Sequence, residues 1–347
     1  MAVRVAINGF GRIGRAFLRA SWDSPDIEII AINDLGDINN LAYLLQYDSV
    51  YRTFVQKVSV DSGQLVVGDP SSPLGASKRI HVTTEKDPSK LPWGSLNIDV
   101  AIESTGVFDT YEKASAHLTA GAKRVVITAP VKDDSENGAT VLVGVNEEKL
   151  ATCQITSNAS CTTNSASPLI AILDEKLGIE KALLNTTHAY TATQSIVDSP
   201  VRGADMRRGR AAAQNITPSS TGAAVAVTKA YEQLAGKFDG ISLRVPVVAG
   251  SIVDITFLAK RDTTAEEVNK ILEDAASEER WKGIFAVSRE QLVSSDIIGN
   301  PHASIADLAM TRVVGGNLVK VLGWYDNEMG YVHTLLRHVA EAGKHTK

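Results

Sequence analysis

Residues 157–164 place a cysteine in a polar setting. The segment reads Ser-Asn-Ala-Ser-Cys-Thr-Thr-Asn, so Cys161 has hydroxyl and amide neighbours and precedes an apolar run of helical character. A structural cysteine is usually buried among apolar side chains, whereas a nucleophilic cysteine needs surroundings that stabilise its thiolate. The segment therefore predicts a reactive Cys161. The only other cysteine, Cys153, has ordinary neighbours and is interpreted as structural.

A histidine follows in the polar segment 185–191. If His188 meets Cys161 in space, the two form the nucleophile and base of a covalent catalytic site. The alternative, a histidine in a purely structural role, is equally common for His188 considered alone. The start of the helix after the cysteine is also open, because Pro168 either begins it, at Ser167 and Pro168, or lies inside an earlier, bent helix.

Two further segments have residues suited to anions. Residues 218–224 place three hydroxyl groups and a glycine before a predicted helix, an arrangement that binds phosphate through backbone N–H groups. Residues 205–210 form a basic loop, for which the alternative is a solvated surface, more so for Arg208 and Arg210 than for Arg207. Arg244 interrupts an apolar strand, where an arginine is costly unless paired. Its predicted partner is a phosphate or a buried carboxylate such as Asp254.

The N-terminal segment carries a dinucleotide-binding pattern. Gly9, Gly11 and Gly14 match G-x-G-x-x-G between a predicted strand and a predicted helix, and Asp34 ends the next strand. Glycines of this spacing let a pyrophosphate approach the backbone and the helix N-terminus. The Asp34 carboxylate suits ribose hydroxyls and repels a 2′-phosphate, so the pattern favours NAD over NADP. The alternative is a strand-to-helix turn with no ligand.

Composition excludes several classes of protein. The 347 residues carry a net charge of −5, with 44% hydrophobic and 22% charged residues, which gives no indication of nucleic-acid binding. The N-terminus does not resemble a signal peptide, and no apolar run reaches the roughly 20 residues that cross a membrane. Two cysteines without metal-ligand spacing indicate neither a disulfide framework nor a metal site. A cytoplasmic protein is expected.

The first half of the sequence predicts an α/β fold. Strand-like runs at 3–7, 27–32, 98–102 and 124–128 alternate with helical patterns at 12–22 and 110–120. Such alternation is typical of a parallel sheet covered by helices. Residues 51–81 have short alternating segments and turn residues, which predict an antiparallel insertion.

The second half predicts an α+β domain with a mainly antiparallel sheet. Residues 181–190, 238–248 and 251–259 are rich in β-branched residues, and a capping-box pattern from Thr263 to Glu266 predicts a helix ending near Ser277. The tail, 328–347, has helical spacing. We expect a Rossmann-type NAD-binding domain at 1–157, completed by the helix at 328–347, and a catalytic domain at 158–327.

Four segments together resemble the phosphorylating glyceraldehyde-3-phosphate dehydrogenase family. They are 7–15, 157–164, 218–224 and 324–331, and the resemblance covers the whole chain. It implies oxidation of D-glyceraldehyde 3-phosphate with NAD⁺ and inorganic phosphate, through a cysteine thioester, to 1,3-bisphosphoglycerate. It also implies a homotetramer, in which the loop at about 192–214 reaches a neighbouring subunit's cofactor site.

The resemblance implies a role for individual residues. Cys161 is the nucleophile, and His188 activates it and serves as the base. The positions implied to hold NAD, with Asn327 on the nicotinamide carboxamide, are Gly9, Gly11, Arg12, Ile13, Gly14, Asp34, Lys86, Thr128, Asn327 and Tyr331. Thr191 and Arg207 match the site of the substrate's phosphate, and further substrate and inorganic-phosphate positions are Ser160, Thr162, Thr221, Gly222 and Arg244.

The chain departs from the usual pattern of the family at three places. Ser165 replaces a common second cysteine, Val225 replaces a common lysine, and residues 201–204 are about one residue longer, which affects the alignment of Arg207. Two alternative functions are retained. One is an erythrose-4-phosphate dehydrogenase, against which the Thr191 hydroxyl favours the triose substrate. The other is a non-catalytic NAD-binding protein, against which the presence of both Cys161 and His188 argues.

Overall fold

The computed structural model describes residues 2–68, 77–201 and 204–346. Its contacts divide the chain into two compact units. The first unit comprises Met1–Val141, Glu148–Asn158 and Leu335–Lys347, and the second comprises Leu142–Glu147 and Ala159–Thr334. These limits differ from the boundaries proposed from the sequence. Residues 142–147 fall in the second unit, and the C-terminal segment joins the first unit at residue 335 instead of 328.

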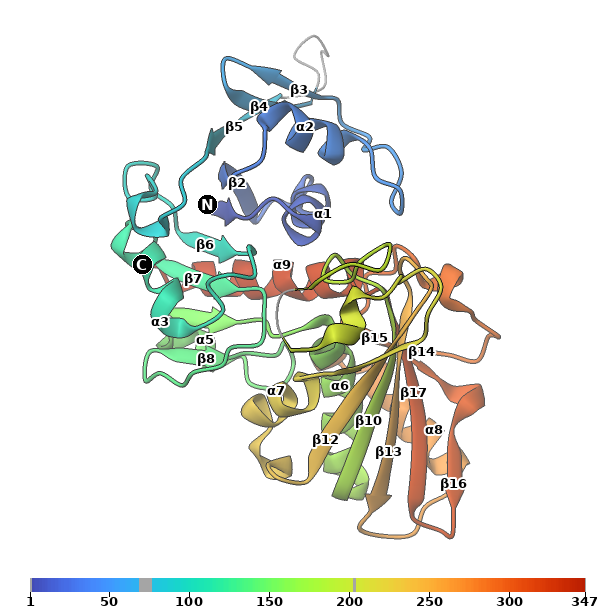
Figure 1. Ribbon diagram of the computed structural model, residues 1–347. Coiled ribbons are helices and arrows are strands. Elements are labelled where there is room, and N and C mark those ends of the chain that lie inside the picture. Colours follow the sequence, from blue (N-terminus) through green and yellow to red (C-terminus); the bar gives the residue numbers. More distant parts are fainter. Residues whose placement is uncertain (1, 69–76, 202–203, 347) are drawn as a thin grey trace. The chain divides into compact units, whose positions relative to one another are not determined.

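The first unit contains a nine-stranded sheet in the order β3-β4-β5-β2-β1-β6-β7-β9-β8 (Figure 1). Its strands are β1 (Val3–Asn8), β2 (Ile27–Asn33), β3 (Val58–Asp61), β4 (Gln64–Val67), β5 (Lys78–Thr83), β6 (Val100–Glu103), β7 (Arg124–Ile127), β8 (Gly138–Thr140) and β9 (Ile155–Ser157). Its helices are α1 (Arg12–Ser21), α2 (Ile38–Gln46), α3 (Tyr111–Ala114), α4 (Ala116–Thr119), α5 (Lys149–Thr152) and the part of α9 (Met329–Lys344) from Leu335 onward.

The predicted α/β fold of the first unit is confirmed. β1 pairs in parallel with β2 and β6, and β6 pairs in parallel with β7. All residues of β6 and β7 are buried, as expected of parallel strands covered on both faces. β3, β4 and β5 form the predicted antiparallel insertion, and β5 joins β2 in parallel.

The second unit contains an eight-stranded sheet in the order β11-β12-β10-β13-β17-β15-β14, with β16 paired to β17. Its strands are β10 (Ile179–Ala189), β11 (Thr217–Ser220), β12 (Phe238–Val245), β13 (Ser251–Ala259), β14 (Phe285–Ser288), β15 (Ser304–Asp307), β16 (Arg312–Val314) and β17 (Leu318–Tyr325). Its helices are α6 (Cys161–Leu177), α7 (Ala223–Ala230) and α8 (Ala265–Ala276), and α9 begins here. Apart from the β10–β12 and β14–β15 pairs the sheet is antiparallel, which confirms the prediction.

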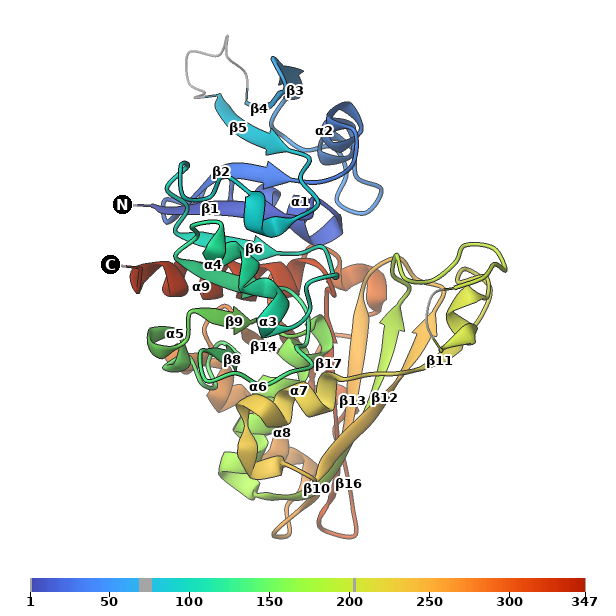
Figure 2. The ribbon, with the colours of Figure 1, turned by 60° about the vertical axis from the view of Figure 1, so that its left-hand side comes forward.

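One face of this second sheet carries the core. Along β13 every second residue is buried, so Val253, Ile255 and Phe257 face inward. They join Leu169 and Ile172 of α6 in one apolar cluster, and α6, α7 and α8 cover this face (Figure 2). Period-two burial is the expected pattern for a sheet with one covered face. The packing of α6 against this face of the sheet positions the N-terminus of α6, where Cys161 lies.

Some helix ends differ from those predicted. α8 is capped by Thr264, whose side chain accepts from Glu267 N at 3.2 Å, so the capping signal is one residue later than the Thr263 pattern. The predicted helix at 110–120 is two short helices, α3 and α4, joined at Ser115. Among the described residues, no helix is long and apolar enough to cross a membrane.

Candidate active site

Cys161 is the first residue of helix α6. Ser160 caps the helix, and its Oγ accepts a hydrogen bond from Thr163 N at 3.1 Å. Because the cap closes the first turn, the helix begins at the cysteine and not at Ser167, the other start allowed by the sequence. Cys161 is partly exposed, and the unpaired N–H groups of a helix N-terminus favour a thiolate there.

Pro168 therefore lies inside α6. Proline has no N–H to donate, so the carbonyl of Asn164 loses its usual helical partner. The Ser167 hydroxyl contacts this carbonyl at 3.5 Å and partly replaces the missing bond. The helix does not begin at the proline, because the Ser160 cap and the buried apolar residues of α6 stabilise the longer helix.

Cys161 and His188 meet as predicted. His188 comes near the end of β10, and its Nε2 is 3.3 Å from Cys161 Sγ. His188 is only 2% exposed, and its ring packs against that of Tyr325 in a T-shaped arrangement. A histidine that served only to fill the core would have no reason to face a sulfur at a helix N-terminus. The geometry is that of a nucleophile and its base.

Two groups compete for the second ring nitrogen of His188. Nδ1 lies 2.6 Å from the Ala189 carbonyl and 2.8 Å from Arg244 Nη1. The carbonyl only accepts, so it favours a proton on Nδ1 and a lone pair on Nε2 that faces the sulfur. The guanidinium only donates, so it favours the opposite tautomer. The charge and position of Arg244 therefore influence whether His188 is ready to act as a base.

The protonation of the pair follows from burial and from Arg244. Burial raises the pKa of the Cys161 thiol, while Arg244 and the backbone N–H groups of Thr162 and Cys161 lower it. Burial lowers the pKa of His188 to about 3, and the positive charge of Arg244 adds to this effect. At neutral pH His188 is an uncharged imidazole, which can accept a proton as the sulfur attacks.

Among the residues that the structure describes, Arg244 pairs with no carboxylate. Asp254, the partner considered from the sequence, forms its ion pair with Lys320. Arg244 instead lies directly opposite His188 in the register of β10 and β12 and also contacts the Ala189 carbonyl at 3.4 Å. Its Nε is buried without a hydrogen-bond partner. A partly buried guanidinium in this state is suited to an anionic ligand.

The basic loop holds a second candidate arginine, Arg208, beside the predicted Arg207. Arg207 bonds to Asp205 with its side chain 60% exposed, whereas the Arg208 side chain is 26% exposed. Arg208 donates to Thr193 Oγ1 at 2.9 Å and to Ser219 Oγ at 2.8 Å. Its charge also acts on His188 and Arg244. The geometry thus favours Arg208 over Arg207. The lengthened segment 201–204 includes residues 202 and 203, which lie outside the described part of the chain.

The remaining predicted anion residues divide into two groups. Thr191 lies near Thr193, hydroxyl to hydroxyl at 3.0 Å, and Thr221 accepts from Ala223 N at 3.2 Å beside Gly222, where α7 begins. Thr162 differs, because it is buried and its hydroxyl contacts Tyr325 Oη at 2.9 Å. The Thr162 hydroxyl therefore bonds within the interior, and both its side chain and its backbone N–H lower the pKa of the neighbouring Cys161 thiol.

Both NAD residues predicted in the 324–331 motif, Asn327 and Tyr331, are buried in the second unit. Asn327 Oδ1 accepts from Ser251 Oγ at 3.0 Å, and the same Oγ accepts from Ala189 N at 3.1 Å. Tyr331 donates to the Ala159 carbonyl at 3.2 Å. These bonds tie Asn327 to the residue that follows His188, so the amide is held in a fixed orientation.

The glycine pattern forms a close-packed turn in the first unit. Gly9 has a φ of +94°, and a Cβ there would lie 2.7 Å from the Ser104 carbonyl carbon; a Cβ on Gly14 would lie 2.5 Å from the Gly9 carbonyl oxygen. Both positions therefore require glycine. By contrast, no atom of the described residues lies within 4 Å of a Cβ on Gly11, and the Gly11 cap of α1 has no side-chain hydrogen bond. An open, uncapped helix N-terminus fits a pyrophosphate.

The other predicted NAD residues lie at or near strand ends of this unit. Asp34 follows β2, and its carboxylate accepts from Phe10 N at 2.7 Å and Gly36 N at 2.8 Å. Thr128 follows β7 and donates to the Glu103 carbonyl at 3.1 Å. Ligands of open α/β sheets bind at the carboxyl ends of strands. Ile13 is partly exposed and Lys86 is exposed, and the Arg12 guanidinium pairs with Asp48.

Comparison with known proteins identifies the family. Residues 3–111 match the NAD binding domain of glyceraldehyde 3-phosphate dehydrogenase, and residues 160–327 match the C-terminal domain of the same enzyme. The glyceraldehyde-3-phosphate dehydrogenase of Thermotoga maritima is 50% identical over 94% of this chain and 95% of its own. Glyceraldehyde-3-phosphate dehydrogenase 1 of Bacillus subtilis is 46% identical over 99% of this chain and 100% of its own.

The chain belongs to the glyceraldehyde-3-phosphate dehydrogenase family. Its first unit is accordingly an NAD-binding domain, and NAD is the cofactor. The glycine turn at the start of α1 fits this cofactor on structural grounds alone, because it leaves space where a phosphate must approach.

Several residues that contact the predicted site residues in the structure are not predicted from the sequence. Tyr325 bonds to Thr162 and Thr186 and packs on His188, yet only its place in the 324–331 motif draws attention to it. Arg208 is visible only as one of three arginines in a loop without periodicity. Thr193 and Ser251 are hydroxyl residues of a kind too common to stand out.

The structure shows the surroundings of Ser165 and Val225, two departures from the family pattern. Ser165 is fully buried and contacts the Ser304 hydroxyl at 3.4 Å, so a second cysteine is replaced by a residue with a polar partner. Val225 is 53% exposed on α7, and nothing in the structure explains its replacement of a lysine. Among the described residues, no cluster of His, Cys, Asp and Glu is suited to a metal ion.

Proposed function

We propose that this chain converts D-glyceraldehyde 3-phosphate to 1,3-bisphosphoglycerate with NAD⁺ and inorganic phosphate, through a thioester on Cys161. The observation that carries the proposal is the 3.3 Å separation of Cys161 Sγ and His188 Nε2 in a member of this family. The product is a high-energy acyl phosphate, and membership of the family assigns the reaction to glycolysis or its reversal.

The first step is attack of sulfur on the aldehyde carbon. As the S–C bond forms, His188 takes the thiol proton and returns it to the former carbonyl oxygen, which gives a hemithioacetal. Backbone N–H groups of Cys161 and Thr162 at the start of α6 stabilise negative charge on sulfur. The Ala189 carbonyl holds the His188 tautomer that this step requires.

The second step is oxidation. Bound NAD⁺ would supply the acceptor for the hydride of the hemithioacetal carbon. His188 removes the hydroxyl proton at the same time, and the Cys161 adduct becomes a thioester. Asn327, held by Ser251, is the residue proposed to orient the nicotinamide carboxamide. Asp34 and the turn at Gly11 are proposed to hold the ribose and the pyrophosphate.

The third step is phosphorolysis. Inorganic phosphate attacks the thioester carbon, the S–C bond breaks, and Cys161 leaves as a thiolate. Two anion-binding groups are needed, one for the substrate's phosphate and one for the attacking phosphate. We assign Arg208 with Thr191 and Thr193, together with Arg244, to these two anions. Ser160, Thr221 and Gly222 are proposed as further contacts.

Arg244 is proposed to couple anion binding to the base. Without an anion it donates to His188 Nδ1 and favours the tautomer that cannot take a proton from sulfur. When an anion accepts from Arg244, the Ala189 carbonyl alone remains at Nδ1. The base is then available when a phosphate is present.

We also propose that the protein is a homotetramer. The outer face of the second sheet has exposed apolar residues, including Leu183 (67% exposed), Ile241 (55%) and Leu318 (39%). A groove of about 770 Å³ includes Leu183 and Leu318 and is otherwise lined mainly by residues of β10, β12, β13 and α7. Exposed apolar surface of this kind favours association with another copy. Mass photometry at nanomolar concentration tests the state, and a monomer would contradict the proposal.

A cytoplasmic location is proposed on chemical grounds. Both cysteines are free thiols, and the reaction needs a reduced Cys161. Disulfide-poor proteins are typical of reducing compartments. Fractionation of the source cells, with the activity followed through each fraction, tests this location.

Formation of NADH is the direct test of the activity. The purified protein is assayed with glyceraldehyde 3-phosphate and with erythrose 4-phosphate, each with and without inorganic phosphate, and with NADP⁺ as the cofactor control. The proposal predicts the highest kcat/KM for the triose, with NAD⁺ and with phosphate. Preference for erythrose 4-phosphate would support the alternative dehydrogenase, and no turnover with either would support a non-catalytic NAD-binding protein.

A further inference from the structure

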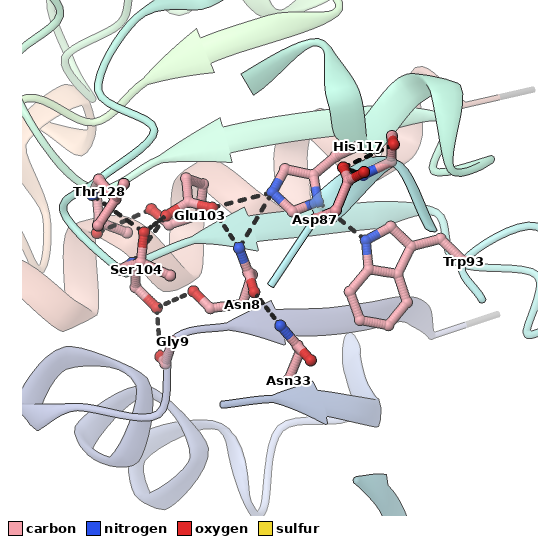
Figure 3. Close-up of polar contacts among 12 residues, drawn as sticks. Asn8, Gly9, Asn33, Asp87, Trp93, Glu103, Ser104, His117 and Thr128 are labelled. Atoms are coloured by element: carbon pink, nitrogen blue, oxygen red, sulfur yellow. Dashed lines mark hydrogen bonds and ion pairs between the residues drawn. The ribbon is translucent and has the colours of Figure 1, made fainter. Parts of the chain in front are cut away.

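The first unit contains a fully buried carboxylate that takes no part in the proposed chemistry. Glu103 ends β6 and is 2% exposed, and its partner His117, on α4, is completely buried. Figure 3 shows both within a chain of polar contacts that also includes Trp93, Asn8 and Asn33. A charge in such a place is costly unless it is paired and hydrogen-bonded. A specific role for Glu103 would account for a buried carboxylate at this position.

The protonation of this pair follows from Trp93. The indole Nε1 donates to His117 Nδ1 at 3.0 Å, and an indole N–H can only donate. His117 Nδ1 is therefore the acceptor, and the ring proton lies on Nε2, 3.0 Å from Glu103 Oε2. His117 thus donates to the carboxylate as a neutral imidazole, which is held in one tautomer.

Both carboxylate oxygens of Glu103 accept hydrogen bonds. Oε2 also accepts from Asn8 Nδ2 at 2.6 Å. Oε1 accepts from the Thr105 backbone N–H at 2.8 Å and from the Thr105 hydroxyl. Four donors converge on one carboxylate, so the side chain has a single orientation and its charge is satisfied.

The network continues across the carboxyl ends of the neighbouring strands. Asn8 ends β1, and its Oδ1 accepts from Asn33 Nδ2, at the end of β2, at 2.7 Å. Asn33 Oδ1 in turn accepts from the Thr83 hydroxyl, at the end of β5, and from Glu85 N, both at 2.8 Å. Four adjacent strands, β5, β2, β1 and β6, are thus tied together by side chains where their ladders end.

The segments that follow these strands are those proposed to bind NAD. Gly9 follows Asn8, Asp34 follows Asn33, and Lys86 follows Glu85. The Gly9 turn also rests directly on the segment after Glu103. Ser104 Oγ donates to the Gly9 carbonyl at 2.7 Å, and the Thr105 N lies within 2.7 Å of where a Gly9 Cβ would stand. A shift of Glu103 or Thr105 would therefore move the Gly9 turn.

We propose that Glu103 and His117 are positioning residues of the NAD site, which fix the spacing of the Gly9 turn, Asp34 and the 104–105 segment. The inference rests on the proposed assignment of these segments to NAD. Neither side chain is proposed to touch the cofactor. They act through Asn8 and Thr105, and they preorganise the site so that less ordering is needed when NAD binds.

Glu103→Gln tests the proposal with almost no change in shape. The amide of the Glu103→Gln variant would carry an NH₂ group in place of one carboxylate oxygen. In one orientation this NH₂ would face the donors Asn8 and His117, and in the other it would face both donors of Thr105. In either case a donor stands where an acceptor is required. Neither orientation satisfies the network. We expect the Kd for NAD⁺, measured by isothermal titration calorimetry, to rise roughly tenfold, as loss of one or two buried bonds implies.

A matched control separates positioning from general loss of stability. Thr156→Val, in β9 of the same unit, removes a buried hydroxyl that bonds to His338 Nε2 at 2.7 Å outside this network. We expect it to leave the Kd for NAD⁺ within twofold of wild type. In steady-state assays Glu103→Gln should raise the KM for NAD⁺ but leave kcat and the KM for the aldehyde within twofold.

The outcomes are distinguishable from those of the proposed function. If the wild-type protein binds no NAD⁺, the function proposal fails. If it binds NAD⁺ and Glu103→Gln binds with an unchanged Kd, or if Thr156→Val weakens NAD⁺ equally, the positioning role is overturned. Should Glu103→Gln not fold, Trp93→Phe removes the N–H that fixes His117, together with part of a buried ring. It should raise the Kd about threefold, and an unchanged Kd would overturn the proposal.

Discussion

Arg244 lies opposite His188 in the parallel pair of strands β10 and β12, with Nη1 2.8 Å from the imidazole Nδ1. The register of two strands therefore places a permanent positive charge behind the base of the site. This charge helps to lower the pKa of His188 to about 3 and opposes the rise in the pKa of Cys161 caused by burial. One arginine thus influences both partners of the Cys161–His188 pair.

His188→Asn should slow alkylation of Cys161 by iodoacetate at pH 7 roughly tenfold. The thiolate is the reactive form, and the variant lacks the base that removes the thiol proton. The rate is measured by mass spectrometry of the peptide that carries Cys161. His302→Asn, which changes a partly buried histidine bonded to Asn300, serves as the control and should react at the wild-type rate. Equal rates for His188→Asn and wild type would show that the pair does not interact.

Arg208→Ala should impair phosphate use more than Arg207→Ala. Arg208 is held between Thr193 and Ser219 near His188, whereas Arg207 is largely exposed. Loss of a charge-assisted contact to an anion is worth about 1.5–3 kcal/mol, so the KM for the aldehyde or for phosphate should rise at least tenfold for Arg208→Ala. For Arg207→Ala we expect less than a threefold change. The reverse order would restore the sequence-based assignment of Arg207.

Asp34→Ala should raise the use of NADP⁺ relative to NAD⁺. The carboxylate follows β2 beside the glycine turn, and its charge repels a 2′-phosphate. The ratio of kcat/KM for the two cofactors should shift by about tenfold or more toward NADP⁺. Asp37→Ala, which removes the cap of α2, is the control for a carboxylate in the same region. An unaltered ratio for Asp34→Ala would remove the proposed ribose contact.

Stability should fall as the pH drops below about 6.5, in part because of His338. Burial lowers the pKa of His338 to about 3 in the folded state, while the unfolded residue titrates near 6.5. Between these values only the unfolded chain binds the proton. The stabilisation is therefore complete above pH 6.5 and is lost as the pH falls toward 3, at about 1.4 kcal/mol per pH unit.

Urea unfolding at several pH values measures this effect through His338→Gln. The glutamine keeps a polar side chain near Thr156 and Asn158, the two partners of His338, but does not titrate. The free energy of unfolding of the variant should therefore decline less steeply than that of wild type between pH 6 and pH 4. Above pH 7.5 the two proteins should show the same pH dependence. Equal slopes at low pH would contradict a depressed pKa.

The chemistry of the site is more visible in the sequence than its geometry. Cys161 and His188 stand out because nucleophiles and bases need particular neighbours, and their contact is as predicted. The start of α6 is undecided in the sequence because Pro168 and Ser160 give opposite local signals, and packing of the helix on the sheet decides between them.

The residues missed in the sequence depend on contacts over long separations. Arg207 and Arg208 are neighbours in an irregular loop, and only the positions of Thr193 and Ser219 distinguish them. Glu103 bonds to Asn8, 95 residues away, and no local pattern reports such a contact. By contrast, the strands β1, β2, β6, β7, β10, β12 and β13 follow from local apolar patterns, and their predicted ends are wrong by only a few residues. The strands β8, β9, β11 and β14 to β17 are not among those predicted, and most of them are short.

A single-turnover reaction without inorganic phosphate decides whether Cys161 carries the acyl group. The protein is mixed with excess NAD⁺ and glyceraldehyde 3-phosphate, and NADH and the mass of the Cys161 peptide are followed together. We predict a burst of about one NADH per site and an acylated Cys161, which phosphate then discharges, with neither signal in Cys161→Ser although it still binds NAD⁺. Continued turnover by Cys161→Ser, or a burst that leaves Cys161 unmodified, would contradict the thioester mechanism.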